Sequence, residues 1–214
     1  MILIDVGMTL AWKEPLSTLY GSIQQGRAED QLAELEDDFP SPADLQTVST
    51  TRTPVQRIEA LAELFSERVK NDEAIGRIRI DGIDLDTVVI EGTDTATLQK
   101  GPGRYPDTAF PGQGRTIGIA GHRTTYSAPF RLINEIEDGD EIVLEMPYGN
   151  FTYVVEKHEI VDPSQVEIVD DVGYERLVLT ACHPLYSAAQ RWAVFAKLED
   201  TSLFASGNRA WQDP

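Results

Sequence analysis

The sequence is poor in the residues that cross-link proteins or bind transition metals. Its 214 residues include one cysteine, Cys182, and three histidines. A single cysteine excludes an internal disulfide framework and any metal site built from several thiolates. It leaves the cellular compartment open, because secreted proteins without disulfides are common. The length suffices for one large domain with its own core, or for a domain with an accessory segment.

Basic residues are also scarce. There are 18 lysines and arginines against 36 aspartates and glutamates, which gives a formal net charge of -18. Binding to nucleic acid requires a basic face that neutralises phosphates, so this composition argues against a nucleic-acid partner. The negative charge favours solubility and indicates no specific ligand by itself.

The N-terminus lacks the length of a membrane helix. Residues 1–11 are mostly apolar but include Asp5 and end before Trp12, whereas a spanning helix needs about 20 apolar residues. The segment fits two interpretations, the outer part of a truncated membrane anchor or a short amphipathic lead-in.

The first third of the chain divides into three segments. Residues 22–38 are polar, with only weak helical spacing of leucines, and residues 39–52 are rich in Pro, Ser and Thr, which predicts a linker. A helix up to residue 70 follows, because Thr53 can cap it, Pro54 suits the first helical position and Gln56 completes a capping box. We expect its apolar face to pack on the main body.

From residue 76 the pattern changes to short apolar or alternating runs broken by Gly, Pro, Asp and Asn, which are typical of strands. The expected strands cover residues 77–80, 85–91, 115–120, 141–146, 151–161, 176–181 and 191–198. The turn signal around Tyr148 predicts that two of them form a hairpin. Seven or eight strands with little helix between them predict a mainly β fold, a closed or nearly closed barrel.

The cysteine stands where a strand is expected to end. Cys182 follows the strand 176–181 and precedes His183 and Pro184, which places its thiol at a strand terminus facing a loop. A lone cysteine is most often a small buried hydrophobe. Nearby positive charge would favour its reactive thiolate form.

Arg191 begins the next expected strand after a short connection, so antiparallel pairing would bring it near Cys182. An arginine in so acidic a chain often forms only a surface ion pair. The alternative is that its permanent charge holds a substrate carbonyl and stabilises the oxyanion of a tetrahedral intermediate.

Of the three histidines, His122 is the strongest candidate for acid and base chemistry. It follows an apolar run that ends in small residues, although a structural role would also suit it. We interpret His158 as an exposed strand residue. We interpret His183 as supporting structure, because it alternates with Cys182. A thiol, an imidazole and a guanidinium at neighbouring strand ends are the groups needed for acyl transfer through a thioester.

Two further patterns resemble ligand loops but are better explained as turns. Residues 101–104 and 112–115 are glycine-rich, yet neither is followed by Lys-Ser/Thr opening a helix, as a phosphate loop would be. The acidic residues 137–141 lack the later bidentate glutamate of a calcium loop.

Three segments together resemble the sortases, the membrane-anchored cysteine transpeptidases of Gram-positive bacteria. They are residues 98–106, residues 120–130, and residues 179–184 with Arg191. The Gly-Pro-Gly-x-Tyr-Pro segment, the Thr-Thr-Tyr after the histidine and the Cys-His-Pro ending most resemble the class E type of actinobacteria, with classes D and F as close competitors. One departure is Ala181, where sortases usually have a threonine before the cysteine.

The resemblance implies an eight-stranded sortase-type β-barrel with short helices and an N-terminal helical segment. It also implies that His122, Cys182 and Arg191 are the catalytic trio, working without metal or organic cofactor. The implied reaction cleaves the Thr-Gly bond of a Leu-Pro-x-Thr-Gly or Leu-Ala-x-Thr-Gly sorting signal. The acyl group passes through a Cys thioester to an amine of the cell-wall precursor or of a pilin lysine. A pilin-polymerising sortase, a hydrolytic cysteine peptidase and a non-catalytic barrel that binds wall peptides are the alternatives.

The family further implies which residues meet the substrate and where the protein acts. Residues 162–173 would form a wall of the peptide groove, with Thr180, Tyr126 and Tyr105 as further contacts. Residues 53–214 would be the catalytic domain with its N-terminal helix, and residues 1–52 the remnant of a membrane anchor and a linker. The expected location is the extracytoplasmic face of the cell membrane.

Overall fold

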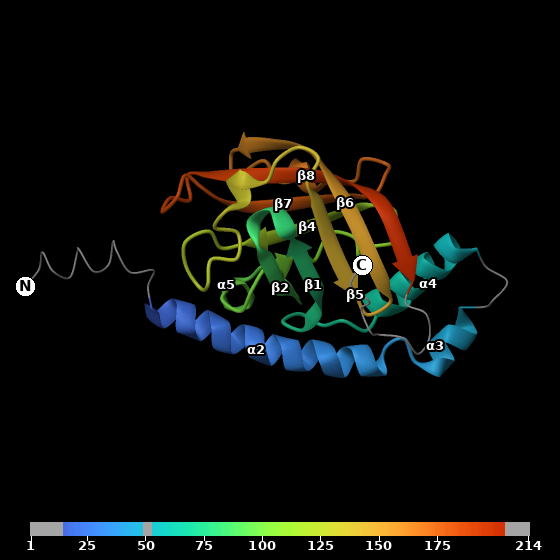
Figure 1. The fold of residues 1–214 in the computed structure, drawn as a ribbon. Coiled ribbons are helices and arrows are strands. Elements are labelled where there is room, and N and C mark those ends of the chain that lie inside the picture. Colours follow the sequence, from blue (N-terminus) through green and yellow to red (C-terminus); the bar gives the residue numbers. More distant parts are fainter. Residues whose placement is uncertain (1–14, 49–52, 204–214) are drawn as a thin grey trace, which may run out of the picture.

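The eight strands of the computed structural model, which describes residues 15–48 and 53–203, form a closed barrel (Figure 1). The strands are β1 (Ala74–Ile80), β2 (Leu85–Glu91), β3 (Gly103–Arg104), β4 (Thr116–Gly121), β5 (Glu141–Met146), β6 (Gly149–Val161), β7 (Arg176–His183) and β8 (Gln190–Leu203). Their order around the barrel is β1-β2-β3-β4-β7-β8-β6-β5. The prediction of a mainly β, eight-stranded barrel is confirmed.

The barrel mixes parallel and antiparallel pairs. Strand β3 is parallel to β2, and β4 is parallel to β7, whereas the other neighbours are antiparallel. All seven strands predicted from the sequence are present. The predicted hairpin is β5–β6, in which Met146 pairs with Gly149. The eighth strand, β3, has only two residues and falls in a segment that the sequence predicts to be a plain turn.

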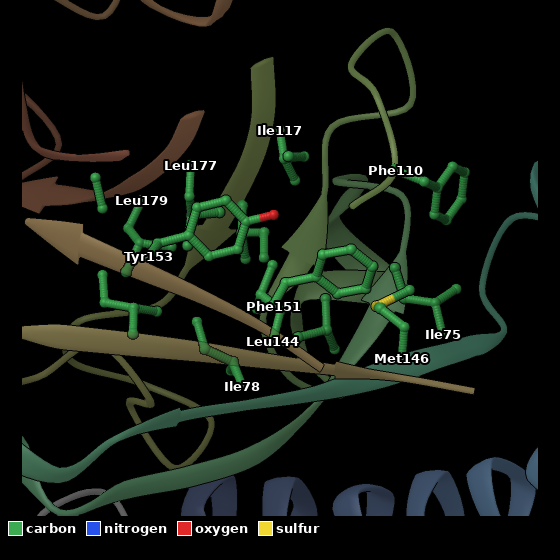
Figure 2. Packing of buried hydrophobic residues seen from close by; sticks show 14 of the residues in the cluster. Ile75, Ile78, Phe110, Ile117, Leu144, Met146, Phe151, Tyr153, Leu177 and Leu179 are labelled. Carbon is green, nitrogen blue, oxygen red and sulfur yellow. The ribbon is translucent and has the colours of Figure 1, made fainter. Parts of the chain in front are cut away.

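The barrel interior is filled by aliphatic and aromatic side chains from every strand except β3 (Figure 2). Tyr153, Phe151 and Leu179 are fully buried there, and Phe110 enters from the loop between β3 and β4. Burial of a side chain of this size contributes roughly 1.5–3 kcal/mol. The closed, filled interior fixes the strand ends that carry the functional residues.

Helix α4 (Pro54–Ser66) has the start that the sequence predicts. Thr53 and Gln56 form the capping box, and Pro54 occupies the first turn. The helix ends four residues before the predicted end. Its buried face includes Phe65, whose ring lies 5.3 Å from that of Tyr148 in the β5–β6 turn. It therefore covers the barrel end near this turn.

The predicted linker 39–52 is wrong where the structure describes it. Residues 42–47 form helix α3 (Pro42–Thr47), and Ser41 caps it in a second capping box. Phe39 and Val48 on either side are buried in the main core. Residues 49–52 lie outside the described residues. The Pro-Ser-Thr composition reflects a helix start and tight turns, because the same residues favour both.

A helix of 24 residues precedes α3, where the sequence shows only weak helical spacing. Helix α2 (Pro15–Asp38) runs along the outside of the barrel, next to β1 and β2 (Figure 1). A one-turn helix, α5 (Thr95–Leu98), follows β2. Within the described parts of the chain, no helix is long and apolar enough to cross a membrane. Residues 1–11, for which an anchor was one interpretation, lie outside the described residues.

Candidate active site

Strands β7 and β8 bring Cys182 and Arg191 together. The two residues are direct partners in the antiparallel register, although the chain between them turns through the connection 184–189. Side chains directly opposite each other on antiparallel strands project from the same face of the sheet. Cys182 is a partly exposed free thiol. The predicted antiparallel pairing is therefore confirmed.

His122 directly follows strand β4 and so reaches the same end of the barrel. The last pair of the parallel β4–β7 ladder is Gly121 with Ala181. One residue further along, β4 continues into His122 and β7 into Cys182. Because equivalent ends of parallel strands meet at one edge of a sheet, His122 and Cys182 follow the ladder side by side.

The imidazole of His122 is half-buried, and one of its ring nitrogens is enclosed without a partner in the described part of the chain. Its Nε2 atom is buried and has no hydrogen-bond partner among the described residues. Burial lowers the pKa of His122 from the ordinary histidine value, because the charged ring is less well solvated there. The histidine that the sequence marks for proton transfer thus keeps a ring nitrogen for another group.

A cavity of about 580 Å³ lies beside Arg191 and Thr180. Thr180 is buried, and its hydroxyl shares a hydrogen bond of 2.8 Å with the hydroxyl of Tyr105, which also lines the cavity. Along a strand, alternate residues share a face, so Thr180 lies on the face of Cys182. Ala181 points the other way, into the barrel core.

The segment after β6 forms one wall of this cavity. It contains the 3-10 helix η3 (Val166–Val169). Arg176 holds this wall in place, since its Nη2 donates to the carbonyl oxygens of Ile168 at 2.8 Å and Asp170 at 3.1 Å. Thr116 adds a hydrogen bond of 2.9 Å from its hydroxyl to the Asp170 carbonyl. These hydrogen bonds therefore hold this wall of the cavity against strands β4 and β7.

Arg191 keeps part of its guanidinium free. Its Nη1 donates to the carbonyl oxygens of Ala188 and Gln190, both at 3.0 Å. A guanidinium has five N–H donors in a fixed fork. The donors on Nε and Nη2 make no hydrogen bond to any residue that the structure describes, so they can bind a carbonyl oxygen.

Arg123 is a site residue that the sequence reasoning missed. It is buried, and its Nη1 donates to the carbonyl oxygen of Cys182 at 3.4 Å and to Nδ1 of His183 at 3.2 Å. Its Nη2 donates to Asn134. These bonds fix the backbone on which the thiol stands, which agrees with the supporting role predicted for His183. A signal existed, because Arg123 directly follows His122 in a chain with few cations.

The structure also places Tyr126 and His158, two further residues considered from the sequence. Tyr126 lies against His122, with ring centroids 5.2 Å apart, and is not among the residues that line the cavity. His158 is exposed on β6, as predicted, and stacks on Trp192 at 5.7 Å.

The comparison with known proteins gives the family. The sequence profile of the Sortase domain matches residues 78–199, more than half of the chain and all of the strands β2 to β7. The chain belongs to the sortase family. Sortase D of Bacillus subtilis (strain 168) is 35% identical over 136 residues, which cover 62% of this chain and 67% of that protein.

Solved sortases share the fold. Sortase E from Streptomyces avermitilis superposes with a TM-score of 0.59 at 33% identity, covering 65% of this chain and 97% of that one. A sortase D5 transpeptidase from Clostridium perfringens gives a TM-score of 0.65 at 25% identity, covering 80% of this chain and 98% of that one. The protein is a sortase, a cysteine transpeptidase. Because its relatives carry both D and E designations, the class E resemblance stays a prediction.

Proposed function

We propose that Cys182, His122 and Arg191 are the catalytic trio of this sortase. The supporting observation is their common position: Cys182 and Arg191 are register partners, and His122 follows the parallel ladder beside Cys182. The unpartnered Nε2 of His122 and the free donors of Arg191 fit their roles. These are a nucleophile, a proton carrier and a fixed positive charge.

In the proposed first step, the Cys182 thiolate attacks the carbonyl carbon of threonine in a Thr-Gly bond. The carbonyl oxygen becomes an oxyanion, which Arg191 stabilises through its free N–H donors. When the intermediate collapses, the carbon–nitrogen bond breaks and protonated His122 gives its proton to the leaving glycine amine. The product is a thioester on Cys182.

The second step reverses the proton movement. An incoming amine attacks the thioester carbon and transfers its proton to His122. The carbon–sulfur bond then breaks, a new amide forms, and Cys182 is released as a thiolate. Water in place of the amine would give hydrolysis.

We propose that the signal peptide lies along the cavity beside Arg191. Tyr105 and Thr180 would contact the peptide residues before the scissile threonine, with the wall 162–173 on the opposite side. Tyr126 would contact the peptide at the His122 end of the groove, since its ring lies against the imidazole. The signal would be a Leu-Pro-x-Thr-Gly or Leu-Ala-x-Thr-Gly sequence, as expected for a class E enzyme.

The acceptor is proposed to be an amine of the peptidoglycan precursor, with a pilin lysine as the alternative. Sortases typically act outside the cytoplasm, so we place this protein at the extracytoplasmic face of the membrane. Residues 1–52 would then connect residues 53–214, the catalytic domain, to a membrane anchor.

Intact-protein mass spectrometry tests the trio. The protein is incubated with labelled peptides carrying either signal, with and without a glycine peptide or a lysine peptide as acceptor. We expect a transient thioester at Cys182 and a ligated product that requires the amine. Substitution C182A should abolish both, H122N should lower kcat about 10²- to 10⁴-fold, and R191Q about 10²- to 10³-fold.

Matched variants separate chemistry from general damage. H158N changes an exposed histidine and R115Q an exposed arginine, and neither should reduce ligation by more than about twofold. Ligation that survives in C182A would contradict the proposed trio. A product that forms equally with and without amine would assign the protein to hydrolysis instead.

A further inference from the structure

We propose that the first two turns of α2 position His122, through Tyr20 and Gly21. This inference rests on the proposed role of His122. It concerns the loop from His122 to Phe130, called here the histidine loop, and its contacts with a helix that lies far from it in the sequence.

The backbone of the histidine loop is strained. Three consecutive residues without glycine's freedom have positive φ angles: Tyr126 at 50°, Ser127 at 64° and Ala128 at 45°. Each such residue costs about 1–2 kcal/mol compared with a right-handed conformation. A loop of this kind keeps its shape only when its surroundings hold it.

Two hydrogen bonds within the loop cannot supply all of this support. The amide of Phe130 donates to the His122 carbonyl at 3.0 Å, and the amide of Ala128 donates to the Thr125 carbonyl at 2.9 Å. They close the loop, but neither reaches the side chain of Tyr126. Further contacts to the strained residues themselves come from α2.

Helix α2 meets the loop at its strained residues. The Ser127 hydroxyl donates to the carbonyl oxygen of Thr18 at 3.2 Å. The ring of Tyr20 packs edge-on against Tyr126, with centroids 6.3 Å apart, and Tyr126 in turn lies against His122. A continuous line of three rings thus connects α2 with the imidazole.

Gly21 permits this approach. A Cβ atom at this position would lie 2.6 Å from the Ser127 hydroxyl oxygen and 2.9 Å from the carbonyl carbon of Tyr126. Both distances are below ordinary contact, and the second involves backbone. Only glycine allows the helix to touch the loop here, although glycine weakens a helix interior by roughly 0.5–1 kcal/mol.

The helix is held against the barrel one turn later, by Gln25. The Gln25 amide nitrogen donates to the carbonyl oxygens of Val88 at 3.2 Å and Lys100 at 2.7 Å. Its amide oxygen accepts from the Val88 amide at 2.9 Å and the Thr87 hydroxyl at 2.7 Å. Because both ends of the side-chain amide are used, α2 cannot slide or rotate without losing them. The position of Tyr20 over Tyr126 follows from this anchor.

A pair of glycine substitutions in α2 tests the proposal. G21A adds a methyl group against the histidine loop, whereas G26A adds one where nothing lies within 4 Å. Both changes favour the helix equally, so only the contact differs. We expect G26A to match the wild type. We expect G21A to lower kcat about tenfold to a hundredfold, and to change kcat more than KM.

The Tyr20 ring gives a second test if G21A folds poorly. Tyr20→Ala removes the ring, and Tyr20→Phe keeps it. We expect the alanine variant to lose kcat and the phenylalanine variant to retain it, because the contact is made by the ring edge. Thermal unfolding of each variant identifies losses that come from instability alone.

The imidazole resonances of His122, assigned by comparison with H122N, report ring position without any substrate. They should shift in G21A and Tyr20→Ala, and stay in place in G26A and Tyr20→Phe. Unshifted resonances together with unchanged kcat in G21A and Tyr20→Ala would overturn the positioning role. The spectrum also tests the positioning of His122 independently of catalysis. If the resonances shift in these variants but the protein ligates no peptide, the proposed function is refuted and the positioning role is supported.

Discussion

At the scale of single residues, the site combines a half-buried imidazole with a partly exposed thiol. Burial lowers the pKa of His122. The neutral ring is therefore favoured in the folded protein compared with the unfolded chain, where histidine titrates near pH 6.5. If His122 carries the proton as proposed, the protonated form that the leaving amine needs is populated less at neutral pH.

This difference predicts a pH-dependent term in stability. Below the unfolded pKa the unfolded chain binds a proton more readily than the folded one, so acidification favours unfolding through His122. The variant H122N cannot titrate. We expect its free energy of unfolding to fall less than that of the wild type between about pH 7.5 and about pH 5.5, measured by urea denaturation. H158N serves as the control, and a wild-type-like pH dependence in H122N would contradict the prediction.

At the scale of secondary structure, the strand ends are fixed by buried polar contacts as well as by the core. Glu175, just before β7, is buried and accepts hydrogen bonds from the amides of Gly112 at 2.9 Å and Gly114 at 2.8 Å, and from the Tyr153 hydroxyl at 2.8 Å. It connects the start of β7 with the loop before β4. These are the two strands that carry Cys182 and His122.

Removing this carboxylate should destabilise the barrel. E175A leaves the buried Tyr153 hydroxyl and two part-buried backbone amides without their acceptor, and we expect the free energy of unfolding to fall by about 2–4 kcal/mol. E199A, which truncates an exposed glutamate on β8, should change it by less than about 0.5 kcal/mol. Urea denaturation measures both, and an E175A protein as stable as E199A would contradict the structural role of Glu175.

The elements also explain which parts of the fold could be predicted. Local sequence patterns predict the helix start at Thr53, through its capping box, and the apolar strands. The short connection between Cys182 and Arg191 likewise predicts that these two residues pair. Helix α2 carried a poor signal, because the stripe that faces the barrel is Gly21, Gln25, Ala28, Leu32 and Leu35, of which only the last two are large and apolar. Gly21 faces the barrel because it allows close approach, and Gln25 because it forms hydrogen bonds. Neither is apolar and large, so neither contributes to a helical hydrophobic pattern in the sequence.

The candidate site could also be predicted only in part from the sequence. Side-by-side placement of His122 and Cys182 depends on the parallel pairing of β4 with β7, which is a long-range contact that no local pattern encodes. The two-residue strand β3 has no period to detect. It forms where Gly103 approaches the Gly92 carbonyl so closely that a Cβ atom would lie 2.0 Å from the oxygen.

At the scale of the whole molecule, the net charge is -18, and the proposed groove is acidic as well. Four aspartates line the cavity against a single arginine, Arg191. They are Asp107, Asp162, Asp170 and Asp171. Charged clefts attract ligands of opposite sign, and their field adds to that of the whole surface. An acidic groove would thus favour signal peptides with a basic residue at the variable position.

We therefore expect a peptide with lysine at the variable position to have a kcat/KM about three- to tenfold higher than the same peptide with glutamate at low salt. The ratio should approach one near 1 M salt, where the Debye length falls to about 3 Å. D107N should reduce the low-salt ratio, because it removes a charge from the cavity. E199Q removes the same charge outside the cavity and should leave the ratio nearly unchanged. A preference for glutamate, or a ratio that salt does not change, would show that the groove's charge does not select the substrate.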